Sequence, residues 1–244
     1  MDYNSRKLVP YIPPAEYDNV ANEFLERFCP DALKNPMPVP IEDIARNGLG
    51  LDVQYICLSE ELDIYGMTIF TDGVVEVYDP NEGLYETKVF KAKTMLIDPE
   101  AVKKTNTGCR NNTIAHECVH WFKHRYYYKM QKFSLPRYAK YCKCRVDQLP
   151  EAIDEENLME SQAIGIAPRI LMPRNTFVEA AEHLGVAYGK DNRSAIITLA
   201  DFFDVSKQSV EIRLEEYGSQ TPSPLHPLGT GHRRDNPSPQ APSW

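Results

Sequence analysis

Residues 112–124 read NTIAHECVHWFKH, and the rest of the chain is interpreted outward from this stretch. It contains the pattern His-Glu-x-x-His. In a helix, residues four apart project from one face about one turn apart, so His116 and His120 can bind the same zinc ion. Glu117 lies beside them and can act as a base toward water. The apolar residues of the stretch recur at helical spacing, which predicts a helix from about Asn112 to Met130.

The composition is that of a globular protein with a net negative charge. The chain has 244 residues, with 27 Lys and Arg against 35 Asp and Glu and a formal net charge of −8. This length suits one large domain, or a domain with a smaller satellite. The negative charge argues against a nucleic-acid-binding surface spread over the molecule. No apolar run is long enough to span a bilayer, and the first residues lack the apolar core of a secretory signal. We therefore expect a cytoplasmic protein with no membrane partner.

The six cysteines are expected to be reduced thiols. In a chain of this size without a secretory signal, thiols are more common than a disulfide scaffold. Cys142 and Cys144 are separated by one residue rather than the two of a zinc ribbon, and the chain has no second pair. The sequence leaves the role of these two cysteines open. Cys118, two residues beyond His116, is predicted to point away from the metal and into the core.

The segments before the motif predict a small, mainly antiparallel sheet. A polar arm precedes a helix from Glu16 to about Leu33, and a second, short helix begins at Ile41. Strands are expected at Leu51–Ile56, Tyr65–Phe70, Val74–Tyr78, Tyr85–Phe90 and Thr94–Ile97. Asp72-Gly73 predicts a tight turn that joins the second and third of these strands in a hairpin.

The segments after the motif are predicted to be mostly helical. Residues 131–155 have no clear period and are interpreted as a solvated insertion, with a substrate-facing flap as the alternative. Four helices should follow, at Asn157–Ile170, Pro173–Leu184, Arg193–Phe203 and Ser206–Tyr217. The Ser/Pro/Gly-rich residues 218–244 are predicted to be a disordered tail.

The predicted elements divide the chain into three parts. Residues 1–40 form an N-terminal arm and helix, residues 41–217 the main domain, and residues 218–244 the tail. Within the main domain we expect a sheet over 51–98, the motif helix over 112–130 and a helical part over 156–217.

A third metal ligand is expected on a later helix. His124 lies eight residues past His116, which is about 12 Å along the helix axis and too far for a shared metal ion. It is better placed to contact a ligand from outside, or to lie on the surface. Glu160 is in phase with the apolar residues of the next helix, where a carboxylate is costly unless it is paired or metal-bound. We therefore favour Glu160, and keep Glu156, one turn earlier, as the alternative.

Three blocks of the sequence resemble the ImmA/IrrE metallopeptidases. The blocks are residues 114–124 with the zinc motif, residues 160–173 with Glu160, and residues 199–214 near the C-terminus. The similarity extends from roughly Ile41 to Tyr217. It implies an α+β fold with a zincin-like core, in which a small sheet and the active-site helix are followed by a C-terminal helical bundle.

The resemblance also implies an activity. Members are zinc-dependent, gluzincin-like endopeptidases of bacteria and their mobile elements, and some cleave a helix-turn-helix repressor. Carried over by position, His116, His120 and Glu160 are the ligands of one Zn²⁺ ion, and Glu117 is the catalytic base. We expect a protein substrate of the repressor type and a role in transcription regulation. The sequence departs from the family where many relatives have Leu-Gly at Cys118-Val119, and in the long segment between His120 and Glu160.

Two other functions are weighed against peptidase activity. The first is a regulatory protein that binds a repressor without cutting it, with the zinc purely structural. Glu117 argues against this function because a structural site needs no base. The second is DNA binding by Arg193–Tyr217, whose two predicted helices and intervening turn resemble a helix-turn-helix motif. Its acidic residues are unfavourable to phosphates, so we expect no direct contact with nucleic acid.

Two features of the peptidase mechanism stay open at this point. A tyrosine would help zinc to stabilise the oxyanion, and the candidates lie in the Tyr126–Tyr128 run, at Tyr138 and at Tyr141. The predicted strand Thr94–Ile97, just before the motif helix, would pair with an extended substrate backbone, or else be ordinary sheet core.

Overall fold

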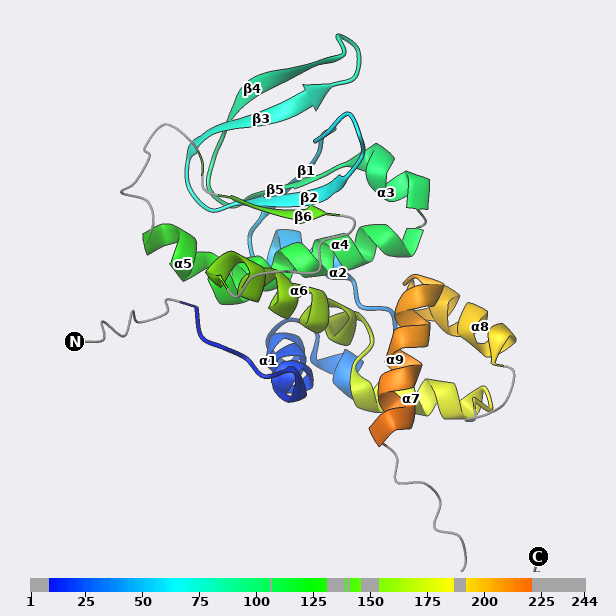
Figure 1. Ribbon diagram of the computed structural model, residues 1–244. Coiled ribbons are helices and arrows are strands. Elements are labelled where there is room, and N and C mark those ends of the chain that lie inside the picture. Colours follow the sequence, from blue (N-terminus) through cyan, green and yellow to red (C-terminus); the bar gives the residue numbers. More distant parts are fainter. Residues whose placement is uncertain are drawn as a thin grey trace, which may run out of the picture.

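The computed structural model places the strands at one end of the molecule and most of the helices at the other (Figure 1). It describes residues 9–105, 107–130, 139, 141–145, 154–186 and 192–220. Helices and small sheets are combined in one chain, which confirms the predicted α+β class. Within these residues, no helix is both long and apolar enough to cross a membrane.

Four strands form the larger sheet, in the order β1-β5-β2-β6. Their bounds are Asp52–Tyr55 for β1, Ile64–Ile69 for β2, Thr94–Ile97 for β5 and Tyr141–Arg145 for β6. β1 is parallel to β5, whereas β2 is antiparallel to both of its neighbours. A separate antiparallel pair, β3 (Gly73–Asp79) and β4 (Leu84–Phe90), lies above this sheet (Figure 1). The predicted, mainly antiparallel pairing is therefore confirmed, but the strands form two sheets and not the single sheet that was predicted.

The predicted hairpin between Tyr65–Phe70 and Val74–Tyr78 is wrong. β2 pairs with β5 and β6, while the described partner of β3 is β4. The carboxylate of Asp72 accepts hydrogen bonds from Lys91 Nζ and from the backbone N–H of Ala92, so it binds the segment after β4. All residues of β2 except Tyr65 are buried, which suits a central strand and not one arm of an exposed hairpin. The Asp72-Gly73 turn correctly predicted that β2 ends nearby, but it did not predict which strands pair with β2.

Strand β6 lies inside the segment that the sequence analysis interpreted as a solvated insertion. For residues 141–145 that interpretation is wrong, because they form a ladder with β2 that runs from Tyr141 opposite Ile69 to Arg145 opposite Ile64. β6 is at the edge of the described sheet. Its short sequence has little strand signal of its own, so the strand depends on the partner that β2 provides.

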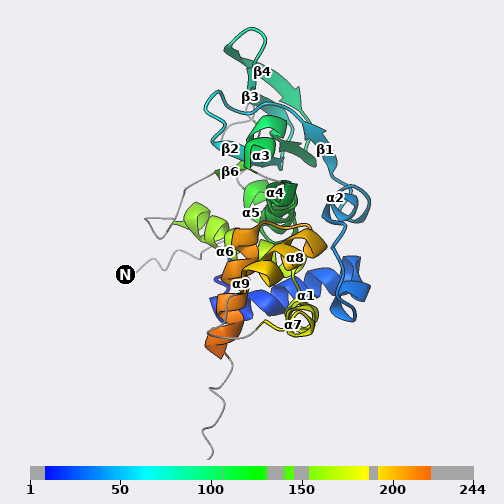
Figure 2. The same ribbon diagram turned by 90° about the vertical axis from the view of Figure 1, so that its right-hand side faces the viewer.

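Three helices pack below the larger sheet, the last of them against both of the others (Figures 1 and 2). They are α1 (Tyr17–Phe28), α4 (Thr107–Val119) and α6 (Glu155–Leu171). α4 contacts the sheet on one side and α6 on the other. It continues through a π-helical turn, η4 (His120–His124), into α5 (Arg125–Met130). The motif helix therefore reaches Met130 as predicted but begins at Thr107, about one turn before the predicted Asn112.

The shorter elements complete the chain. They are η1 (Pro14–Glu16), η2 (Pro30–Leu33), α2 (Ile41–Asp43), η3 (Ile44–Gly48), α3 (Pro99–Thr105), α7 (Arg174–His183), α8 (Arg193–Phe203) and α9 (Lys207–Gln220). α3 was not predicted. The predicted disordered tail lies outside the described residues from position 221 onward.

Buried polar contacts join the C-terminal helices to the rest of the molecule. Asp204, between α8 and α9, has a left-handed φ of 52°, and its backbone and side-chain oxygens accept hydrogen bonds from Asn111 of α4. Arg213 of α9 is 5% exposed and forms ion pairs with Asp18 of α1 and Glu216. One hydrophobic core runs through α1, α4, α6 and α8, so the N-terminal helix packs with the predicted main domain.

Gly165 allows α6 to approach α1 closely. A Cβ atom at this position would lie 2.2 Å from Tyr17 Cε2 and 2.4 Å from Tyr17 Cδ2. We predict that Gly165→Ala lowers the free energy of unfolding by about 1–3 kcal/mol, because overpacking outweighs the better helix propensity of alanine. Urea denaturation measures the change. Ser161→Ala, at an exposed position of the same helix, is the control and should stay within about 0.5 kcal/mol of the wild type. An unchanged stability of Gly165→Ala would contradict the packing described.

Candidate metal centre

Two histidines and one carboxylate converge between α4 and α6. His116, near the end of α4, and His120, at the start of η4, have their Nε2 atoms 2.9 Å apart. From α6, Glu160 places Oε2 at 3.2 Å from His116 Nε2 and Oε1 at 3.2 Å from His120 Nε2. The two helices are packed together, so the backbone holds the three side chains in this arrangement.

This donor set fits a zinc ion. Two nitrogen atoms bound to one tetrahedral zinc at about 2.0–2.1 Å lie about 3.3–3.4 Å apart, close to the separations seen here. Imidazole and carboxylate are both ordinary zinc ligands. The two imidazoles are almost fully buried, whereas the Glu160 side chain is 23% exposed, so the cluster faces solvent on its α6 side. Glu156, the alternative considered from the sequence, is exposed and belongs to no cluster of potential metal ligands in the described part of the chain.

Opposite charges stabilise each other within the cluster. Burial opposes the charged form of Glu160, but His120 and His116 outweigh it and hold the pKa of this carboxyl well below its usual value. Burial likewise opposes protonation of His120, but the Glu160 carboxylate outweighs it and raises the pKa of His120. Glu160 is therefore ionised, as a ligand to a cation must be.

His124 holds His120 from behind. Its Nδ1 lies 3.2 Å from His120 Nδ1, and its Nε2 lies 2.9 Å from Gln162 Oε1. Gln162 Nε2 donates to the carbonyl of Pro10 at 2.9 Å, which fixes the orientation of the amide because a carbonyl only accepts. Burial lowers the pKa of His124 to about 3, so its ring is neutral.

These contacts determine the tautomer of His120. Since Gln162 Oε1 accepts, His124 carries its hydrogen on Nε2 and accepts at Nδ1. His120 must then donate from Nδ1, so Nε2, which is directed at the cluster with His116 and Glu160, is the ring nitrogen available to a metal ion. A histidine ligand whose other nitrogen donates in this way is the usual arrangement in metal sites. His124 thus contacts His120 and lies outside the group of potential donors.

Glu117 is completely buried between α4 and the sheet. Its Oε2 accepts a hydrogen bond from Cys142 Sγ at 3.4 Å. Its Oε1 has no hydrogen bond of ordinary geometry among the described residues. Burial raises the pKa of Glu117, although His116 and His120 oppose the shift. A carboxyl group with a raised pKa is suited to accept and release a proton near neutral pH.

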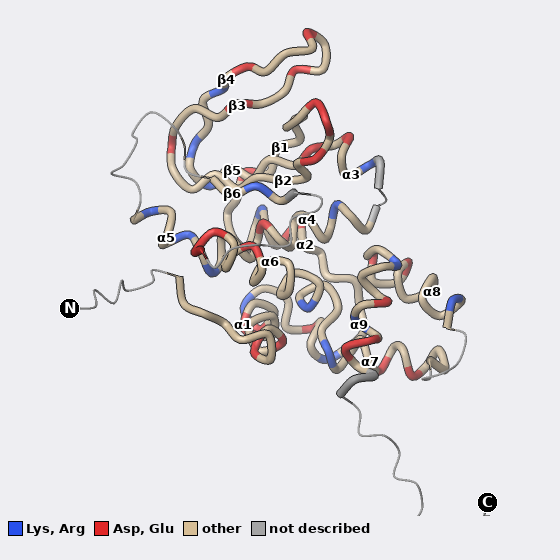
Figure 3. The backbone as a smooth tube through the Cα atoms, viewed as in Figure 1, with Lys and Arg blue, Asp and Glu red and all other residues tan. Residues whose placement is uncertain are grey.

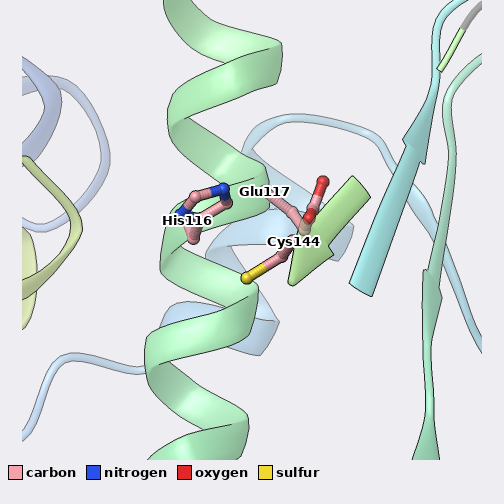
Figure 4. A group of neighbouring side chains, drawn as sticks. All are labelled: His116, Glu117 and Cys144. Atoms are coloured by element: carbon pink, nitrogen blue, oxygen red, sulfur yellow. The ribbon is translucent and has the colours of Figure 1, made fainter. Parts of the chain in front are cut away.

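Cysteines of β6 complete the surroundings of Glu117. Figure 4 shows Cys144 reaching from the strand toward the helix that carries His116 and Glu117, and donor atoms of these three residues lie within 4.8 Å of one another. The sequence analysis did not predict this contact. The available signal was the one-residue spacing of Cys142 and Cys144, which in a strand turns both side chains to the same face. Cys118, by contrast, is fully buried in the core, as predicted.

Among the predicted tyrosines, Tyr128 is buried and is influenced by charged groups of the site. Tyr126 is 65% exposed, whereas Tyr127 and Tyr128 are buried. Burial raises the pKa of Tyr128, and Cys142, Glu160 and Glu117 raise it further. Tyr138 lies outside the described residues, and Tyr141 is part of β6.

Removing the Glu160 carboxylate should weaken zinc binding. We predict that Glu160→Ala lowers zinc affinity by about 100-fold or more, because a ligand contributes more than the outer partners that typically account for 10- to 100-fold. Metal analysis and competition with a chromogenic chelator measure the effect. Glu156→Ala, one turn away on the same helix, is the matched control. Equal zinc affinities for Glu160→Ala and Glu156→Ala would show that Glu160 is not the third ligand.

Removing the His124 imidazole should weaken zinc binding less. We predict that His124→Ala lowers the affinity by about 10- to 100-fold, because His120 loses the partner that orients its ring. The same chelator competition measures it, with His183→Ala, at an exposed helix end, as the control. Wild-type affinity in His124→Ala would show that the contact does not orient His120.

Comparisons with known proteins agree with the sequence motifs. Residues 102–215 match the Peptidase_M78 family model, which is described as the IrrE N-terminal-like domain. A search of curated proteins finds no match. Among solved structures, the chain is similar to one described as a Mycobacterium tuberculosis transcriptional regulator, at 17% identity and a TM-score of 0.40. That match covers 84% of this chain and 47% of the other, so the chain spans about half the length of that protein. Residues 102–215 therefore form an IrrE N-terminal-like domain of the Peptidase_M78 family, as the resemblance to ImmA/IrrE metallopeptidases predicted.

Proposed function

We propose that this protein is a zinc-dependent endopeptidase. His116, His120 and Glu160 hold one zinc ion, and Glu117 is the catalytic base. The observation that carries the proposal is the convergence of two imidazole nitrogens and one carboxylate within 3.2 Å, next to a second, buried carboxylate. Three protein ligands are typical of catalytic zinc sites, whereas structural sites usually have four. The metallopeptidase-type family model supports the same assignment.

The reaction assigns distinct tasks to the residues of the site. Zinc, when bound, is a Lewis acid that polarises a carbonyl and makes water acidic near neutral pH. Glu117 accepts a proton from the attacking water and delivers it to the leaving amine. Its raised pKa suits both transfers. His124 and Gln162 keep the His120 ring in the tautomer that leaves Nε2 free to bind the metal.

We propose Tyr128 as the hydrogen-bond donor to the oxyanion. Its side chain is buried, and Glu117 and Glu160 raise its pKa. Burial keeps its hydroxyl protonated, so it can donate.

The proposed substrate is a protein, and specifically a helix-turn-helix repressor of a mobile element or stress regulon. This part rests on the resemblance to the ImmA/IrrE family. Direct binding of nucleic acid is not proposed. On α8 and α9, acidic residues stand beside the few basic ones (Figure 3), and Arg213 is buried in ion pairs with Asp18 and Glu216.

The substrate cannot add to the strand that the sequence analysis considered. β5, residues Thr94–Ile97, is paired with β1 on one side and with β2 on the other, so neither of its edges is available. The alternative interpretation, ordinary sheet core, is the right one: all four residues are buried.

Replacing Glu117 by glutamine should separate catalysis from metal binding. We predict that Glu117→Gln slows cleavage of the repressor by about 100-fold or more, since amide nitrogen and oxygen cannot take up the proton. Zinc content should be unchanged. The assay is incubation with a candidate helix-turn-helix repressor, with and without a chelator, and detection of fragments on a gel. Glu156→Gln is the control and should cleave at the wild-type rate. Cleavage by Glu117→Gln at that rate would show that Glu117 is not the catalytic base.

A non-cleaving regulatory protein is the second candidate. The observation that favours it is the hydrogen bond from Cys142 to Glu117, which covers the proposed base. Such a protein would bind the repressor and leave it intact, so an unfragmented repressor that co-elutes with the zinc-loaded protein would support this candidate over the first.

A further inference from the structure

Strand β6 lies in the space that a scissile peptide would need. Reacting atoms must come within about 3–3.5 Å of the groups that act on them. Cys142 Sγ already lies 3.4 Å from Glu117 Oε2, and Cys144 Sγ is within 4.8 Å of donor atoms of Glu117 and His116. A substrate cannot reach Glu117 while these two thiols are in place.

The backbone of β6 also takes the edge at which an extended substrate would bind. Peptides bind to sheets by adding a strand to an unpaired edge. Strand β2 lies directly beside Glu117, since a Cβ atom at Gly66 would lie 3.2 Å from both Cγ and Oε1 of Glu117. One side of β2 is paired with β5, and the other is paired antiparallel with β6. In that register Gly66 lies opposite Cys144, and Thr68 lies opposite Cys142.

We propose that β6 is an internal occupant of the substrate-binding edge, and that the chain as seen is a latent peptidase. β6 takes the backbone partners of a substrate strand, and Cys142 and Cys144 cover Glu117 and His116. A substrate binds by replacing β6 on β2. This inference rests on the proposed function, since it concerns access to the same catalytic site.

The exchange is energetically reasonable because one strand replaces another. A bound substrate offers β2 the same kind of backbone hydrogen bonds that β6 offers, so few are lost. β6 is short and lies at the edge of the described sheet, and such a strand is held mainly by its partner. Only molecules in which β6 has left β2 can bind a ligand at this edge. The observed affinity is therefore the intrinsic affinity multiplied by the fraction of such molecules.

The reactivity of Cys142 reports directly on this displacement. The residue is 5% exposed, whereas Cys118 is completely buried in the helical core. The zinc-loaded full chain is treated with iodoacetamide, with and without a saturating extended peptide hydroxamate, which binds both zinc and a strand edge. Mass mapping gives the alkylation rate at each cysteine.

We predict that the hydroxamate raises the alkylation rate of Cys142 by about tenfold or more, because opening exposes the thiol. The rate at Cys118 should not change. An unchanged or slower rate at Cys142, with the hydroxamate bound, would show that ligands bind beside β6 and would overturn the inference.

A variant tests the same idea through affinity. Cys142→Asp buries a second carboxyl group against Glu117, and the cost of that burial should drive β6 from β2. Hydroxamate affinity should then rise by about tenfold or more. Lys143→Asp introduces a carboxylate on the opposite face of the strand, with a charge change of two units against one for Cys142→Asp, and should still change the affinity less than about twofold. No gain in Cys142→Asp, at normal zinc content, would contradict the inference.

The two proposals fail in different ways. If the repressor stays uncut although zinc is bound and the hydroxamate uncovers Cys142, peptidase activity is wrong and the occupancy of the edge stands. If the repressor is cut while Cys142 labelling is insensitive to the hydroxamate, only the occupancy by β6 is wrong.

Discussion

The contact of Glu160 with His116 and His120 is the constraint on which the rest of the structure depends. A partly buried carboxylate and two buried imidazoles are costly unless they pair with one another or with a metal ion. Their pairing requires α6 to lie directly against α4. Small residues also let α6 pack closely in the helical layer: Ala163 and Ala167 are completely buried, and Gly165 admits the ring of Tyr17 from α1. The helical layer is thus arranged so that donors far apart in sequence meet at one point.

The side of α4 that faces away from α6 is arranged around Glu117. This carboxylate lies under β2, where Gly66 leaves room for it, and under β6, where Cys142 donates to it. The metal donors therefore face α6, while the base faces the sheet. A reaction that needs both must bring water and substrate to the boundary between the two layers. Strand β6 lies at that boundary, so the pairing of β6 with β2 controls access to the site in the proposed mechanism.

Much of this was predictable from local patterns, because local spacing fixes which face of a helix a residue occupies. His116 and His120 share a face through their four-residue spacing, and Glu160 was recognised as a charged residue among apolar positions of a helix. The same reasoning failed for the hairpin at Asp72-Gly73. Turn chemistry decides that the chain reverses, but the partner of a strand depends on which surfaces are buried, and β2 is buried on both faces.

The sequence by itself determined the α+β class, the motif helix, the donors His116, His120 and Glu160 as a candidate set, and the inward direction of Cys118. Each of these depends on periodicity within one element. Only the tertiary structure decided that β6 pairs with β2, that His124 and Gln162 orient His120, and that Cys142 and Cys144 face Glu117. These contacts join residues from separate elements, and pairing across a sheet or between helices is set by the packing of the whole core and not by spacing along the chain.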